Sequence, residues 1–127
     1  MTKATVLILG GTGEARALAR CLVASGPPGL AVVSSLAGRV SRPALPEGDV
    51  RIGGFGGVSG LTAWLVEQEV SVVVDATHPF ATTISAHAVA ACADARVPLL
   101  SLVRPPWTAR AGDSWHEVAS LAEAAAL

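Results

Sequence analysis

An apolar run that ends in a glycine turn and gives way to a helical pattern sets the narrowest limits on the fold. Residues 4–9 (ATVLIL) are almost all apolar and rich in β-branched side chains, which is typical of a strand buried on both faces of a parallel sheet. Gly10 to Gly13 end this run, and apolar residues then recur at helical spacing from Ala15 to Val23 until Gly26. The chain therefore opens with a strand, a tight glycine turn and a helix.

Strand and helix patterns go on alternating after this first unit. Apolar runs predict further strands at 30–35, 49–52, 70–74 and 97–103. Helical spacing predicts a helix capped by Ser59 that ends near Glu69, another from Ala81 to Ala95, and an Ala-rich helix at 117–127. Because strands that alternate with helices form parallel sheets with right-handed crossovers, the sequence predicts an α/β fold, a Rossmann-like parallel sheet of about five strands with helices on both faces.

The composition limits the classes of partner. The 127 residues carry a formal net charge of -1 and no run of Lys or Arg, so neither nucleic acid nor a charged membrane surface is expected. No stretch reaches the roughly 20 apolar residues of a membrane span, and residues 4–9 are too short a run for a signal peptide. We therefore expect one cytoplasmic domain that binds small molecules. Cys21 and Cys92 match neither a disulfide framework nor a zinc site, and both thiols are expected to be buried.

The glycine turn after the first strand is a candidate cofactor site. Ligands of such folds bind at the carboxyl ends of the strands, where a helix N-terminus offers backbone N–H groups to a pyrophosphate. Gly10, Gly11, Thr12 and Gly13 lie at this junction, and the Thr12 hydroxyl can add a donor. Arg16 takes the place of the third glycine of G-x-G-x-x-G, so a tight turn without a ligand remains the alternative.

The end of the second predicted strand indicates which dinucleotide would fit. An acidic residue there holds the ribose hydroxyls of NAD, but no Asp or Glu occurs between Glu14 and Glu47. The chain instead has Ser34, Ser35 and Arg39, whose hydroxyls and guanidinium can bind a 2′-phosphate by charge-assisted hydrogen bonds. This pattern favours NADPH. Strand-end capping by the serines and a solvated loop arginine are the alternatives.

Two further groups follow predicted strands. Four glycines, Gly54 among them, surround Phe55 after the third strand, and they indicate either backbone packed against a flat ligand or a flexible turn. Asp75, Thr77 and His78 follow the fourth strand, where a nicotinamide and its substrate would lie and where His78 can donate a proton. In the structural alternative, His78 bonds to the backbone and Asp75 caps the next helix.

The remaining polar candidates lie further along the chain. Arg104 and Trp107, around two prolines, can grip a substrate carboxylate and stack on a ring, or else they stiffen a link to a second domain. We expect His87 to lie at the surface or in packing. His116 has no companion ligand, so no metal site is predicted.

Five motifs, in matching order and spacing, resemble those of the precorrin-6A reductase family. They span positions 7 to 107 and are far more specific together than a glycine turn alone. The motifs are Leu7–Arg16, Ser35–Arg39, Gly53–Leu65, Asp75–Ala81 and Arg104–Trp107.

The resemblance implies an NADPH-dependent reductase of the cobalamin pathway. Members transfer a hydride to one double bond of the tetrapyrrole precorrin-6A while a proton adds to the neighbouring carbon, which gives the dihydro-precorrin precorrin-6B. Neither flavin nor metal is implied. Carried over by position, the pyrophosphate would meet Gly11, Thr12 and Gly13, the 2′-phosphate would meet Ser35 and Arg39, and the nicotinamide and substrate would lie near Asp75, Thr77 and His78.

The chain departs from this family in length. Members are about twice as long and hold the macrocycle between two α/β domains. We expect residues 1–104 to be the NADPH-binding Rossmann-like domain and residues 105–127 to be a linker and first helix leading towards an absent C-terminal domain. Two alternatives stay open: an NADP(H)-binding module without its own catalysis, and a reductase of a small cyclic imine of the dihydrodipicolinate reductase type.

Overall fold

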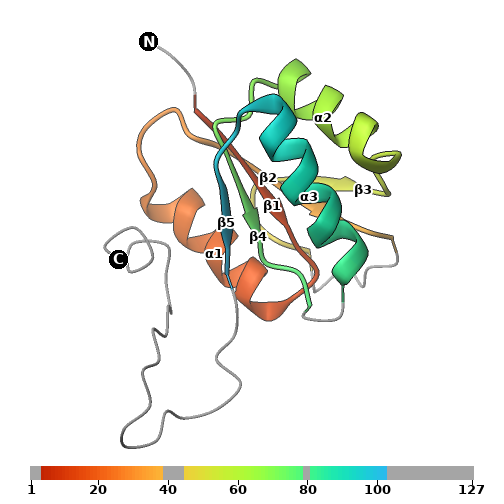
Figure 1. Cartoon of the computed structure of the whole chain (residues 1–127). Coiled ribbons are helices and arrows are strands. Elements are labelled where there is room, and N and C mark those ends of the chain that lie inside the picture. The colour runs from red at the N-terminus through yellow and green to blue at the C-terminus, as the bar shows by residue number, and fades with distance from the viewer. Residues whose placement is uncertain (1–3, 39–44, 79–80, 103–127) are drawn as a thin grey trace, which may run out of the picture.

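Helices and strands alternate along the chain, except that one strand directly follows another. The computed structural model describes residues 4–38, 45–78 and 81–102. In chain order the elements are β1 (Thr5–Leu9), α1 (Gly13–Ser25), β2 (Ala31–Leu36), β3 (Asp49–Ile52), α2 (Gly57–Glu67), β4 (Val72–Asp75), α3 (Thr82–Ala95) and β5 (Leu99–Ser101). Figure 1 shows them coloured in this order.

The described strands form one parallel sheet in the order β3-β2-β1-β4-β5. Its central strand is β1, whose last residue, Leu9, lies opposite Ser35 of β2 on one side and Asp75 of β4 on the other. The strand order reverses between β1 and β4, and doubly wound sheets bind ligands outside the carboxyl ends of their strands at such a point. The predicted Rossmann-like sheet of five parallel strands is confirmed.

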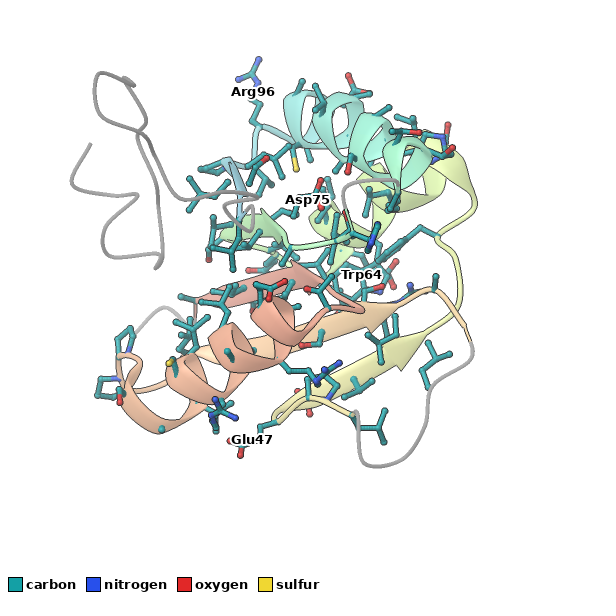
Figure 2. The ribbon with its side chains drawn as sticks, turned by 90° about the horizontal axis from the view of Figure 1, so that it is seen from below. Glu47, Trp64, Asp75 and Arg96 are labelled. Carbon is teal, nitrogen blue, oxygen red and sulfur yellow. The ribbon has the colours of Figure 1, made fainter. Side chains whose placement is uncertain are left out.

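Two apolar clusters attach helices to opposite faces of the sheet, as Figures 1 and 2 show. Successive side chains of a strand point to opposite faces, so β1 supplies both clusters. Val6 and Ile8 pack with α1, whereas Leu7 and Leu9 pack with α2 and α3. In α3 the fully buried Ala88 and Ala91 have no bulk beyond Cβ, which lets this helix lie close to its neighbours.

Some predicted element boundaries are wrong by a few residues. Helix α2 begins at Gly57, with Gly56 as its cap in a left-handed conformation (φ 86°), so Ser59 lies inside the helix and does not cap it. The backbone N–H of Val70 donates to the carbonyl of Leu65 (3.0 Å), which ties this valine to the last turn of α2, and β4 begins only at Val72. An apolar pattern alone does not distinguish a buried helix end from the first residue of a strand.

The two cysteines differ in exposure, and only one matches the prediction. Cys92 in α3 is buried, and this burial raises the pKa of its thiol. Cys21 in α1 is exposed, so its predicted burial is wrong.

The described ranges contain neither a membrane-spanning helix nor a cluster of metal ligands. No helix there has the length and apolar character to cross a membrane. In the same ranges, no three His, Cys, Asp or Glu side chains come together in a group that could hold a metal ion.

Candidate functional site

A cavity of about 520 Å³ lies at the carboxyl ends of β1, β2, β3 and β4 and at the start of α3, within the size range of small-molecule sites. The segments that follow these four strands and the first turns of α3 meet there. Its lining consists of Ser35, Ala37, His87 and the ranges 9–11, 53–57, 77–78 and 81–84. The cavity therefore lies beside the reversal of strand order.

The glycine turn after β1 is tied to both neighbouring strands. Gly10 donates its backbone N–H to the carbonyl of Ser35 (2.9 Å). Thr12 is the N-cap of α1, because its Oγ1 accepts from the N–H of Ala15 (3.1 Å). The same hydroxyl donates to the carbonyl of Ala76 (2.6 Å), just beyond β4. Since a hydroxyl has one proton, the Thr12 side chain does not donate to a ligand while this bond is kept.

Backbone groups of this turn remain suited to an anion. The first N–H groups of a helix have no partner within it, and the helix dipole places a partial positive charge there. Gly11 has φ 108°, a left-handed conformation that glycine adopts without strain, and it lines the cavity. A Cβ added to Gly13 would have Arg16 as its nearest neighbour at 3.7 Å, so space lies open above this residue.

The two serines at the end of β2 point in opposite directions. Ser35 lines the cavity, as predicted for a residue near the cofactor. Ser34 is 1% exposed, is not part of the lining, and its Oγ has no hydrogen-bond partner in the described ranges. Alternation along the strand places Ser34 on the α1 face of the sheet. The structure therefore places Ser34 outside the cavity that Ser35 lines.

Arg51, which is not among the predicted cofactor residues, organises the turn after β3. Its guanidinium donates to the carbonyls of Gly53 (3.0 Å) and Gly54 (3.3 Å) and lies 3.8 Å from the centre of the Phe55 ring. Phe55 in turn packs edge-on against Trp64 of α2, with ring centres 5.5 Å apart. The Gly53–Gly57 cluster is thus anchored where it follows β3 and lines the cavity.

Asp75 and Thr77 form a local hydrogen-bonded unit at the end of β4. Asp75 Oδ1 accepts from the backbone N–H of Thr77 (3.1 Å) and from its hydroxyl (2.6 Å). Thr77 Oγ1 is also 3.3 Å from Ser85 Oγ of α3, and because the Thr77 proton faces Asp75, Ser85 is the donor in this contact. Ala81, which has no side-chain cap bond, is the N-cap of α3, so Asp75 does not cap that helix.

Two imidazoles line the cavity. His78 follows the Thr77 turn, and its carbonyl accepts from the N–H of Ala81 (2.9 Å). His87 also lines the cavity, although the sequence pattern assigned it to the surface or to packing. The sequence did contain a signal that His87 lies in the site. His87 comes one helical turn after Thr83, on a helix that starts close to the end of the fourth predicted strand.

The described lining of the cavity holds no carboxylate that would repel an anion. No Asp or Glu is among the described residues of the lining, and its only ionisable side chains are the two histidines. The predicted cofactor residue Arg39 and the predicted substrate residues Arg104 and Trp107 lie outside the described ranges.

Comparison with known proteins identifies relatives over nearly the whole chain. The family model described as "Precorrin-6x reductase CbiJ/CobK" matches residues 5–127. A precorrin-6A reductase of Rhodococcus erythropolis is 55% identical over 122 residues, which are 96% of this chain and 48% of that protein. A precorrin-6A reductase of Mycobacterium tuberculosis is 61% identical over 102 residues, 80% of this chain and 40% of that protein.

A solved structure agrees with these matches. The structure titled "CobK precorrin-6A reductase" superposes with a TM-score of 0.75 at 50% identity and covers 97% of this chain and 48% of that one. The chain thus spans somewhat less than half the length of these relatives. With a family model that matches nearly all of its residues and a shared fold at this level of identity, the chain belongs to the precorrin-6A reductase family.

Proposed function

We propose that this chain is the NADPH-binding half of a precorrin-6A reductase. One observation carries the proposal: a cavity at the reversal of strand order is bounded by a glycine turn at a helix N-terminus and has no carboxylate among its described lining residues. Such a site suits the phosphates of a dinucleotide. Membership of the family supplies the reaction, because the relatives bear the name of a reductase that acts on precorrin-6A.

In the proposed assignment, backbone groups hold the pyrophosphate. Gly11 and Gly13 leave room for close approach, and Thr12 contributes its backbone while its side chain fixes the turn. At the end of β2, Ser35 and Arg39 are assigned to the 2′-phosphate. Ser34 is left out of this set because it lies on the other face of the sheet.

The proposed reaction moves one hydride and one proton. When bound, NADPH supplies the hydride to one carbon of a double bond in the macrocycle. The proton for the neighbouring carbon is assigned to an imidazole of the cavity, His78 or His87, since both line it. Asp75 and Thr77 are positioning residues here, because their hydrogen bonds to each other and to Ser85 hold the turn from which His78 projects.

Gly13→Ala tests whether the glycine turn serves a ligand or only the fold. Gly13 is the first residue of α1, and its added Cβ would meet no atom closer than 3.7 Å, so the thermal midpoint should stay the same or rise slightly. The methyl group would occupy space assigned to the pyrophosphate, so calorimetric titration should show NADPH affinity weaker by about tenfold or more. Unchanged NADPH affinity in a folded Gly13→Ala protein would leave the plain-turn interpretation standing.

Turnover then separates the reductase from a binding module. The chain with NADPH and precorrin-6A is followed by loss of dihydronicotinamide absorbance and by the formation of precorrin-6B. Consumption of both substrates supports reduction by this chain. NADPH binding without consumption assigns the cofactor half alone to it, and absence of binding refutes the cofactor assignment.

A further inference from the structure

Arg51 faces the position at which a dinucleotide-binding sheet reads the ribose. It lies in β3 directly opposite Ser35 of β2, and its Nη1 is 3.5 Å from Ser35 Oγ. In folds of this kind, the residue at the end of the second strand meets the 2′ substituent of the adenosine ribose. The guanidinium therefore lies beside the Ser35 hydroxyl, which is the group expected to contact a 2′-phosphate.

The guanidinium is held in one plane before any ligand arrives. Nη1 donates to the carbonyl of Gly53 and Nη2 to that of Gly54, while the Phe55 ring covers the group at 3.8 Å. Trp64 lies farther away, with its ring centre 5.7 Å from the guanidinium carbon. A pre-oriented guanidinium loses little freedom when it binds a planar or tetrahedral anion.

The positive charge of Arg51 has no counter-ion in the described part of the chain. Its acceptors in the described ranges are neutral, namely two carbonyls and one hydroxyl, and the hydroxyl contact is at the long limit of a hydrogen bond. A guanidinium has five N–H donors, so three acceptors leave donors for a further ligand. The bond to Gly54 is exposed, and two acceptors of this guanidinium, Ser35 and Gly54, line the cavity, so the group lies next to the cavity without being part of its lining.

We propose that Arg51, together with Ser35, recognises the 2′-phosphate and makes the site selective for NADPH over NADH. This inference rests on the proposed function and extends it, because it adds a second cation to the position assigned to Arg39. Ser35 connects the cavity to Arg51. It lines the cavity and its hydroxyl contacts the guanidinium, so one phosphate can meet both residues. Charge-assisted bonds of this kind are about twice as strong as neutral ones.

The test compares the affinities of the 127-residue chain for NADPH and NADH by calorimetric titration. In Arg51→Met, NADPH affinity should fall by about 10- to 100-fold, while NADH affinity should change by less than about threefold. Arg51→Lys keeps the charge but loses the forked donors, so it should keep part of the preference. Arg96→Met is the matched control, because Arg96 is exposed beyond the end of α3 and points away from the fold in Figure 2.

The outcomes separate this inference from the proposed function. Selective loss of NADPH affinity in Arg51→Met, with Arg96→Met unchanged, supports it. An equal loss of affinity for NADPH and NADH would show that Arg51 only holds the glycine cluster. An unchanged preference for NADPH would assign the selectivity to other residues. Either result overturns the inference and leaves the proposed NADPH binding intact. A wild-type chain without preference for NADPH overturns both. If Arg51→Met does not fold, Arg51→Lys is the deciding variant. The inference is refuted if Arg51→Lys prefers NADPH over NADH as strongly as the wild type does, or if it loses affinity for both nucleotides equally.

Discussion

Replacing Thr12 by Val should destabilise the protein far more than its half-exposed surface position suggests. The Thr12 hydroxyl makes two hydrogen bonds, one within the start of α1 and one to the backbone beyond β4. Valine keeps the shape of threonine, and the extended conformation of Thr12 (φ -122°, ψ 164°) suits a β-branched side chain. The substitution therefore removes two hydrogen bonds and leaves the packing nearly unchanged.

The size of the effect follows from what each lost bond leaves behind. Loss of an N-cap hydroxyl costs about 1 kcal/mol of stability. The carbonyl of Ala76 belongs to a residue that is 1% exposed, so water does not readily replace the hydroxyl, and an unsatisfied acceptor costs about 1–2 kcal/mol more. The sum of about 2–3 kcal/mol corresponds to a fall of roughly 8–12 °C in the thermal midpoint for a domain of this size.

Urea and thermal unfolding of two matched threonine variants measure this effect. Thr62 Oγ1 also donates to a carbonyl, that of Val58 (2.8 Å), but this is a turn of its own helix in which the carbonyl keeps its backbone bond. Thr62→Val should therefore stay within about 0.5 kcal/mol of the wild type, and Thr12→Ser should restore most of the stability that Thr12→Val loses. Equal midpoints for Thr12→Val and Thr62→Val would refute the view that Thr12 ties the glycine turn to β4.

Two further predictions concern packing and thiol chemistry. Gly60→Ala should lower the free energy of unfolding by about 1–3 kcal/mol, because its Cβ would collide with the backbone carbonyl of Phe55; a change equal to that of Gly54→Ala, whose Cβ would meet nothing within 4 Å, would contradict this. A disulfide reagent should label exposed Cys21 quickly and buried Cys92 only on unfolding. One labelling rate for both thiols would contradict this. Since burial raises the pKa of the Cys92 thiol, the unfolded chain ionises first, and the free energy of unfolding should fall as the pH rises through the alkaline range of a thiol; a stability that does not change over that range would be the contrary result.

The sequence predicts the sheet well because one-dimensional patterns encode burial. The run at 4–9 is apolar on both faces, and β1 is indeed covered by helices on both sides. Predictions fail where the deciding contact is distant in sequence or depends on side-chain direction. Cys21 lies in an apolar stretch of sequence, as core residues do, yet its side chain is exposed.

The sequence predicts where the residues of the site lie better than it predicts what each side chain does there. Residues at the ends of β1, β2 and β4 line the cavity because parallel strands bring their carboxyl ends together. Ser34 and Ser35 are the same residue type, so the sequence does not distinguish them. Only the alternation of side chains along β2 shows that Ser35 faces the cavity and Ser34 faces α1. Arg51 could have been found by pairing β2 with β3, since it is the residue opposite Ser35, but that register needs the structure.

The order of strands also bears on how the chain reaches its fold. The central strand comes first in the sequence, yet one of its two neighbours arrives much later, since Val6 pairs with Val72. Until β4 has left the ribosome, one edge of β1, whose sequence is TVLIL, has no partner. Such an edge can pair with other chains. Expression of this protein should therefore be sensitive to events during translation, and β1 is the segment whose premature exposure would drive aggregation.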